Sequence, residues 1–157
     1  MFEARLIIES SMAALAAERG KEEHHAALAE EVAEMYAIAD NPADFLIHDM
    51  LFHRLIAKAS GNPILAALIE TITTAMYEKR RKTVERANYL REMAEMHREI
   101  YRAIRAHDPV EARKQMEHHL HMAESAQNME LPGLRPRRPA QTAALKPPAL
   151  LDSNSAQ

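Results

Sequence analysis

The chain contains no cysteine and no tryptophan, and it has only three glycines among its 157 residues. Without cysteine there is no disulfide framework and no thiolate for catalysis or metal binding. No apolar run approaches the roughly 20 residues of a membrane-spanning helix, and the N-terminus lacks the basic and then apolar segments of a signal peptide. We therefore expect a cytoplasmic protein that has no membrane partner.

The formal net charge of −3 is unevenly distributed along the chain. Residues 131–157 carry four basic side chains against Asp152, a net charge of +3, which leaves −6 for residues 1–130. An acidic globular part is a poor candidate for binding the phosphate backbone of DNA by itself. Any contact with DNA is therefore expected to be made by a segment that this chain does not contain.

Alanine, leucine, glutamate, methionine, arginine and histidine dominate the composition, which favours helices over strands. Apolar residues recur every three or four positions in six segments bounded by helix start or stop signals. The predicted helices cover residues 2–19, 22–40, 42–60, 63–82, 88–106 and 109 to about 129. Their short connections predict an all-α fold, an antiparallel bundle of about six helices over residues 1–130. Residues 131–157 hold five prolines and no helical period, so they predict an extended or disordered tail.

Four polar residues lie on the apolar faces of the predicted helices: Asp49 and His53 on the third, His97 on the fifth and His119 on the sixth. Asp49 and His53 are four residues apart, so they share one helix face. Burying a carboxylate and three imidazoles is costly unless they hydrogen-bond to one another or bind a cation. The set suits zinc, nickel or a similar divalent ion, but a buried polar network without metal satisfies the same spacing.

The other polar side chains divide into inward and outward groups. Arg5 lies on the inward row of the first helix, where it either pairs with Glu9 one turn later or offers a buried guanidinium to a ligand carboxylate. Arg80 continues the inward row of the fourth helix. By contrast, four histidines are expected at the surface, because they lie in a polar first turn or off the apolar row: His24, His25, His118 and His121.

Three stretches resemble, in the same order, the successive signatures of one family. They are FEARLIIESSMAALAA at residues 2–17, DMLFHRLIAKASGNPIL at 49–65 and MHREIYRAIRAHDPVEARKQMEHHL at 96–120. The chain resembles the effector-binding domain of GntR-family transcription regulators, the FadR C-terminal domain class, over about residues 2–123. Its six helices resemble the shorter, VanR-like subgroup. The resemblance implies a helical bundle that forms a homodimer and binds a small organic acid beside or on a metal ion.

The resemblance also implies roles for particular residues. In metal-binding members, an Asp and a His four apart join two later histidines to hold the ion, and these positions match Asp49, His53, His97 and His119. An arginine of the first helix helps to receive the effector carboxylate in relatives, and Arg5 matches it. Arg80 is predicted to join the same ligand site because of its position on the inward row of the fourth helix, and not through the resemblance.

The family pattern also carries an N-terminal winged-helix DNA-binding domain, whereas this sequence starts at the first helix of the effector domain. We therefore expect a fragment of a regulator whose absent domain binds DNA, and not an enzyme. Two alternatives stay open. One is a metal-dependent hydrolase that uses a metal-bound water as nucleophile, and the other is a metal-free dimerisation bundle with a buried histidine network.

Overall fold

The structure is a computed structural model that describes residues 2–87 and 89–128. This part of the chain forms six α-helices and no strand, which confirms the all-α prediction. The helices are α1 (Phe2–Arg19), α2 (Glu22–Ala37), α3 (Pro42–Ala59), α4 (Pro63–Arg86), α5 (Leu90–Arg105) and α6 (Pro109–Gln127). The predicted tail over residues 131–157, and with it the boundary at residue 130, lies outside the described residues.

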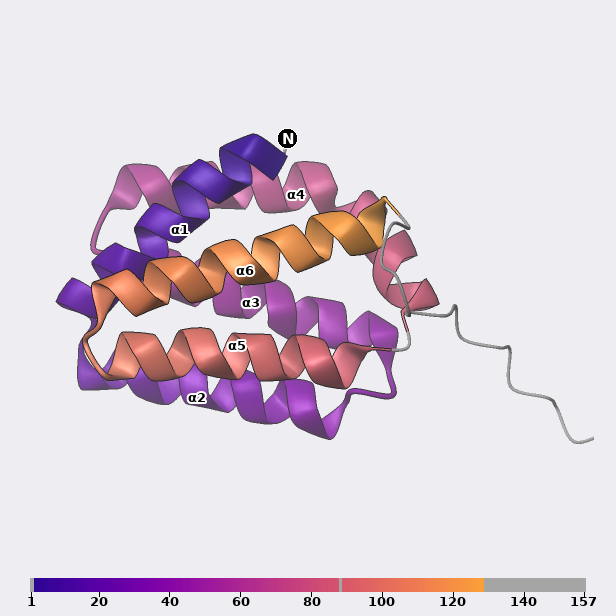
Figure 1. Cartoon of the computed structure of the whole chain (residues 1–157), viewed down its shortest axis with the longest axis horizontal. Helices are drawn as coiled ribbons and strands as arrows, with labels where there is room; N and C mark the ends of the chain where they lie inside the picture. The colour runs from indigo at the N-terminus through magenta and orange to yellow at the C-terminus, as the bar shows by residue number, and fades with distance from the viewer. Residues whose placement is uncertain (1, 88, 129–157) are drawn as a thin grey trace, which may run out of the picture.

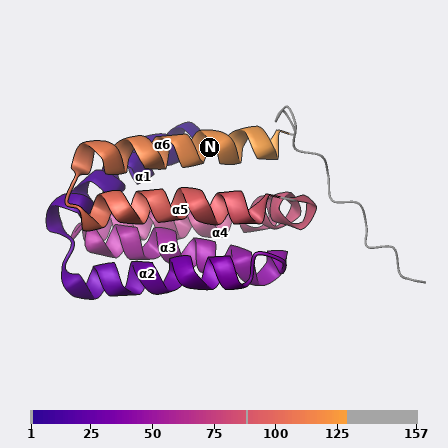
Figure 2. The same cartoon turned by 60° about the horizontal axis from the view of Figure 1, so that its bottom comes forward.

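The helices pack as a bundle in which consecutive helices reverse direction (Figures 1 and 2). α3 contacts α1, α2 and α4, while α5 contacts α2 and α6. α1 contacts α3, α4, α5 and α6, and its most extensive contact is with α6. The first and last helices of the described chain therefore lie against each other, and the bundle closes between them.

Three helices begin with the same local arrangement, an N-cap side chain followed by proline at the first helical position. Asn62 Oδ1 accepts hydrogen bonds from the backbone N–H groups of Ile64 (3.0 Å) and Leu65 (3.3 Å). Asp108 Oδ1 accepts one from the N–H of Glu111 at 2.9 Å. These caps satisfy N–H groups that have no partner within the helix, and they confirm the predicted starts of α3, α4 and α6.

Two helix ends differ from the prediction. α2 ends at Ala37 instead of Asp40, because a turn over residues 38–40 leads directly into the cap of α3. α4 continues to Arg86 instead of ending at Lys82. Arg81 pairs with Glu78 and Glu85 at helical spacing, so the basic segment that was expected to end the helix prolongs it.

Apolar side chains from all six helices form one core. Its large, fully buried members include Met12, Met35, Phe45, Phe52 and Met116. The ring of Phe52 meets the ring of His97 edge to face, with centroids 5.0 Å apart. The core therefore packs directly against the polar residues that the sequence places on its inner faces.

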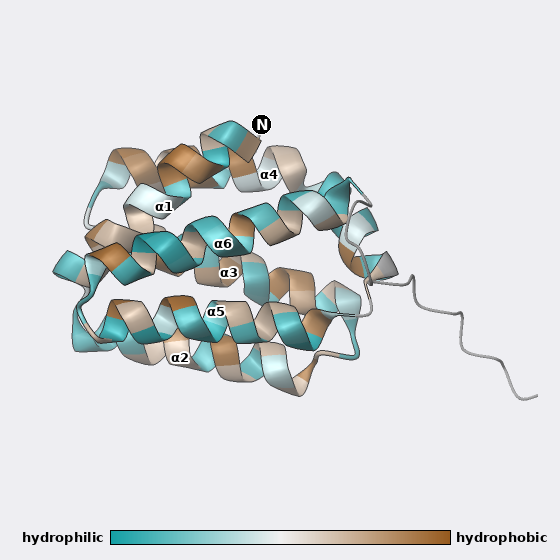
Figure 3. Ribbon diagram, in the orientation of Figure 1, coloured by the Kyte–Doolittle hydropathy of each residue, from teal (hydrophilic) through white to brown (hydrophobic). Residues whose placement is uncertain are grey.

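Several apolar side chains of the described residues are exposed, among them residues of α1 and α4. Figure 3 marks the hydrophobic residues along the ribbons of these helices. Ile64 and Leu68, one turn apart on α4, are 70% and 42% exposed, and Ile7 on α1 is 64% exposed. α1 and α4 contact each other. In the described part of the chain, no helix combines the length and the apolar character needed to cross a bilayer.

Candidate metal centre

Asp49 and His53 of α3, His97 of α5 and His119 of α6 meet inside the bundle. Each is at most 2% exposed. Each offers a carboxylate oxygen or a ring nitrogen, and these four atoms lie within 4.8 Å of one another. The site therefore depends on three helices packing together, and we refer to these four residues as the Asp–His cluster.

The hydrogen bond of His97 determines which of its nitrogens is free. Its Nδ1 donates to the backbone carbonyl of Met93, one turn earlier, at 2.7 Å. Burial lowers the pKa of His97 to about 3, so the ring is neutral at pH 7 and its Nε2 carries a lone pair. That Nε2 lies 2.9 Å from Oδ1 of Asp49. Two acceptors repel at this distance unless a proton or a metal ion lies between them.

The ring of His53 is arranged like that of His97, with Nδ1 facing an acceptor. Its Nδ1 lies 2.6 Å from Oε2 of Glu9, which is fully buried on α1, although the contact lacks the alignment of a good hydrogen bond. Burial would raise the pKa of Glu9, but His53 and Arg5 outweigh it and hold the pKa well below its usual range. Because an ionised carboxylate can only accept, the proton of His53 belongs on Nδ1. Nε2 is then free, 3.8 Å from Oδ1 of Asp49.

His119 completes the cluster from α6. Its ring centroid lies 4.4 Å from that of His97 and 5.2 Å from that of His53. Burial, followed by the nearby His97, lowers its pKa well below the usual value, so the ring is neutral. Three histidine rings and a carboxylate are a donor set that zinc, nickel and similar ions accept.

The unpaired atoms test whether a cation fits this cluster. Several buried atoms of the four residues have no hydrogen-bond or ion-pair partner outside the cluster among the described residues: Oδ1 of Asp49, Nε2 of His53 and of His97, and Nδ1 of His119. Such atoms are costly to bury, and a divalent ion bound among them would satisfy several at once. The residues present therefore fit a metal ion.

Two arginines lie beside the cluster. Arg80 of α4 forms an ion pair with Oδ2 of Asp49. Burial, with a smaller contribution from Arg5, lowers the pKa of Arg80 to about 9, so it is still charged at pH 7. Nε of Arg5 lies 2.5 Å from Oε1 of Glu9. Arg5 is only 3% exposed, so the helical pair and the buried guanidinium considered from the sequence are both present.

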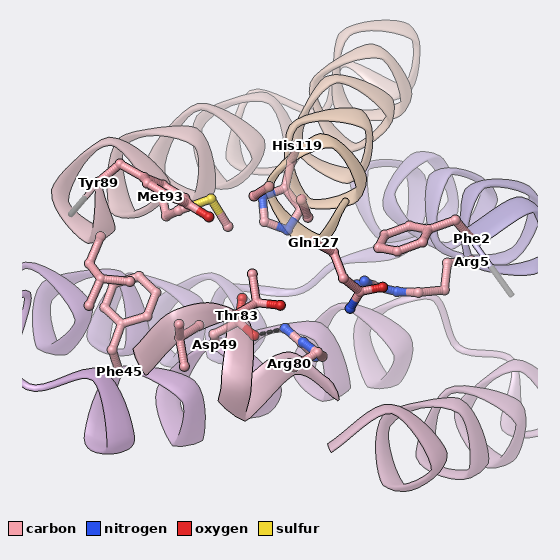
Figure 4. A pocket seen from close by; sticks show the side chains of 14 residues that line it. Phe2, Arg5, Phe45, Asp49, Arg80, Thr83, Tyr89, Met93, His119 and Gln127 are labelled. Carbon is pink, nitrogen blue, oxygen red and sulfur yellow. Dashed lines mark ion pairs between the residues drawn. The ribbon is translucent and has the colours of Figure 1, made fainter. Parts of the chain in front are cut away.

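A pocket reaches the cluster between α1, α4 and α6 (Figure 4). Arg5, Arg80, Asp49 and His119 form part of its wall, and the rest of the wall is largely apolar and includes Phe2. The accessible volume of this pocket is about 40 Å³, which is room for roughly two or three waters. Two cationic side chains facing a small pocket favour an anionic ligand.

The sequence analysis missed two features. Glu9 was considered only as a partner of Arg5, and its contact with His53 depends on how α1 packs against α3. His25 was expected at the surface, but it is 5% exposed and packs against the ring of His107, with centroids 5.2 Å apart. The loop between α5 and α6 covers it, a contact between distant parts of the chain that no local pattern reports. His118 and His121 are exposed, as predicted.

An all-helical bundle with a buried Asp–His cluster beside a cationic pocket defines a small-ligand-binding domain, and comparison with known proteins gives its family. Residues 1–122 match the family described as FCD domain. The chain belongs to the FCD domain family, the effector-binding domain of GntR-type regulators. This confirms the resemblance seen in the sequence.

Individual relatives agree with this assignment. The HTH-type transcriptional repressor NanR of Escherichia coli K12 is 33% identical over 118 residues, which cover 74% of this chain and 45% of the relative. NanR of Edwardsiella tarda is 32% identical over the same length. The chain thus spans about 45% of the length of these curated relatives.

Solved structures support the same fold. Streptococcus agalactiae GntR has a TM-score of 0.67 and 30% identity, and the match covers 79% of this chain and 56% of that one. E. coli McbR/YncC has a TM-score of 0.73 at 22% identity, with coverage of 82% and 62%, and shows the fold alone. Together with the family match, these relatives indicate that the chain is a ligand-sensing regulatory domain.

Proposed function

We propose that Asp49, His53, His97 and His119 hold a divalent metal ion, zinc or nickel, in a domain that senses a small organic acid. The observation that carries the proposal is the approach of His97 Nε2 to Asp49 Oδ1 at 2.9 Å. The Nδ1 hydrogen bond of His97 leaves Nε2 without a proton, so two acceptors face each other in the interior of the bundle. A cation between them removes the repulsion.

The effector is expected to be a small carboxylate. A bound divalent ion would supply a coordination position for one carboxylate oxygen. Arg5 and Arg80 line the same pocket and offer positive charge to the remaining oxygens of the ligand. The apolar part of the wall restricts the carbon skeleton to a small one.

The first test is elemental analysis of purified wild-type protein, with His97→Ala and His119→Ala as site variants and the exposed His121→Ala as a matched control. We expect about one metal per chain in wild type and in His121→Ala, and little in the two site variants. Chelation should lower the melting temperature of wild type, because the ion ties three helices together. If the purified wild-type protein contains no metal and added zinc or nickel leaves its melting temperature unchanged, the result would instead favour a buried polar network without metal.

The chain is further proposed to act within a transcription regulator, as a homodimer, with DNA contacted by a winged-helix domain outside this chain. The relatives described as transcriptional repressors support this proposal. Because these relatives are transcriptional repressors, a sensor is favoured over the hydrolase alternative. Ligand binding that prefers one packing of the helices would shift the arrangement of the dimer and of the domains attached to it. Equal operator affinity of the full-length regulator with and without saturating effector would contradict this switching step.

The dimer is proposed to form through α1 and α4. Both helices carry exposed apolar side chains, Ile7 on α1 and Ile64 and Leu68 on α4, and the helices are in contact. Regulators of this class work as dimers, so a second copy of the chain is expected to cover this apolar face. Association would remove this apolar area from water.

A further inference from the structure

Glu9 and Asp49 are the two carboxylates buried in the described part of the chain. Asp49 belongs to the Asp–His cluster, whereas Glu9 lies on α1, a helix that contributes no ligand. We propose that Glu9 is a positioning residue of the metal centre: it orients His53 for metal binding and links that ligand to Arg5 in the pocket wall. This inference rests on the function proposed above.

Both oxygens of Glu9 are engaged, and Oε2 lies near Nη2 of Arg5 (3.4 Å) as well as near His53. Oε1 lies 2.5 Å from Nε of Arg5, and Oε2 lies 2.6 Å from Nδ1 of His53. The contact with Arg5 therefore fixes the direction in which the carboxylate faces His53. Carboxylate contacts to the second nitrogen of a metal-binding histidine typically orient the ring and raise its basicity.

The charge of Glu9 selects the tautomer of His53. An ionised carboxylate beside Nδ1 attracts a proton there and repels a lone pair, so Nε2 is left as the donor atom facing Asp49. His97 reaches the same tautomer through the carbonyl of Met93 on its own helix. For His53, in contrast to His97, the partner that orients the ring is a side chain from another helix. A substitution of that side chain can therefore remove the partner.

The same contact connects the pocket to the metal centre. Arg5 faces the pocket and holds Glu9 at the same time. An anion that binds Arg5 competes with Glu9 for the guanidinium, and the altered Glu9 changes how His53 is held. Anion and metal binding should therefore be coupled through these three residues.

Glu9→Gln is the informative variant because an amide has only one acceptor oxygen, whereas Arg5 and His53 each need an acceptor. The charged Arg5 forms the stronger hydrogen bond and should take that oxygen. The amide N–H₂ then faces Nδ1 of His53 and favours the proton on Nε2, where it blocks the metal. A matched control exists in Glu31 of α2, which lies 2.7 Å from Nδ1 of His48 on α3. Neither belongs to the cluster or to the pocket wall.

Two measurements test the proposal. Competition with a chelator should show zinc affinity about 10- to 100-fold weaker in Glu9→Gln and unchanged in Glu31→Gln. Long-range ¹H–¹⁵N spectra of metal-free protein should place the His53 proton on Nδ1 in wild type and on Nε2 in Glu9→Gln. If the lone charge left on Arg5 prevents Glu9→Gln from folding, the double variant Arg5→Gln/Glu9→Leu removes that charge and also leaves no acceptor at position 9 for Nδ1 of His53, so it should show the same loss of affinity.

The outcomes separate the two proposals. Equal zinc affinity in wild type and in the Glu9 variant, or the Nε2 tautomer in wild type, would overturn the role of Glu9 while leaving the metal site in place. A wild-type protein that takes up no metal would overturn both proposals. A loss in Glu31→Gln equal to that in Glu9→Gln would mean that any carboxylate next to a histidine of α3 has this effect, and would overturn the assignment to Glu9.

Discussion

Arg5 with Glu9 and Arg80 with Asp49 are two pairs of opposite charge that lie in the interior next to each other. A buried charge is stable only with a partner of opposite charge. Removing one member of the pair leaves the other buried without compensation for its desolvation. The two pairs balance each other, so a divalent ion would add positive charge that an anionic ligand can neutralise. At this scale, the charges favour the acidic effector that is proposed above.

Arg80→Met tests this balance. Without Arg80, metal-free protein buries Asp49 with no cation, and its free energy of unfolding should fall by about 3–5 kcal/mol. The loss should be smaller in zinc-loaded protein, because the ion compensates the carboxylate. Urea unfolding with chelator and with zinc measures the difference. Arg54→Met is the control, since the Arg54–Glu70 pair is solvent exposed and should cost no more than about 1 kcal/mol in either state. Equal losses in both states for Arg80→Met would mean that no ion compensates Asp49.

His25 predicts a dependence of stability on pH. Burial, followed by His107, lowers its pKa, while Glu22 opposes the shift. The folded protein therefore resists a proton that the unfolded chain accepts below about pH 6.5, so stability should fall as the pH drops below that value. His25→Gln should reduce the loss between pH 7.5 and 5.5 in urea unfolding with chelator. The exposed His121→Gln should not, and an unchanged pH dependence in His25→Gln would contradict the assignment.

At the scale of helices, the start of α6 matters because this helix carries His119. Asp108 caps it through a 2.9 Å hydrogen bond to the N–H of Glu111. Asp108→Ala removes this cap and should cost about 1 kcal/mol of stability by urea unfolding. Asp108→Asn keeps an acceptor and should cost much less. If both variants lose the same amount, the charge of Asp108 rather than its hydrogen bond stabilises the helix.

The helices themselves could be predicted from the sequence because their signals are local. Caps such as Asn62 and Asp108 lie next to the helices they start, and the apolar rows report which face turns inward. The inward direction of Arg80 followed from its row in the same way. Its partner Asp49 did not, because the pairing of α3 with α4 is a matter of tertiary packing.

The parts of the site that sequence reasoning missed are contacts between helices. Glu9 reaches His53 only because α1 packs against α3, and His25 is buried only because the loop carrying His107 lies over it. A polar first turn normally predicts exposure, and here a contact from a distant part of the chain overrides that local rule. The apolar rows and the family resemblance both gave the four residues of the cluster, but neither gave the contact of Glu9 with His53.

At the scale of the whole molecule, the exposed apolar side chains of α1 and α4 predict self-association. Ile64→Glu places a charge on this face and should convert the dimer to a monomer in light scattering at micromolar concentration. Val110→Glu is the matched control, because Val110 is 76% exposed on α6, a helix that is not part of the proposed α1–α4 interface. Dissociation by Val110→Glu, but not by Ile64→Glu, would locate the interface elsewhere.

The contact between the first and last described helices also has a consequence for synthesis. A chain emerging from the ribosome presents Glu9 first and His119 last, and α1 stays without its largest packing partner until α6 arrives. Under the proposed function, a nascent chain lacking α6 offers an incomplete donor set. Firm capture of the ion would then come only after α6 has packed, so the metal available at that late stage would influence how much of the protein reaches its native state.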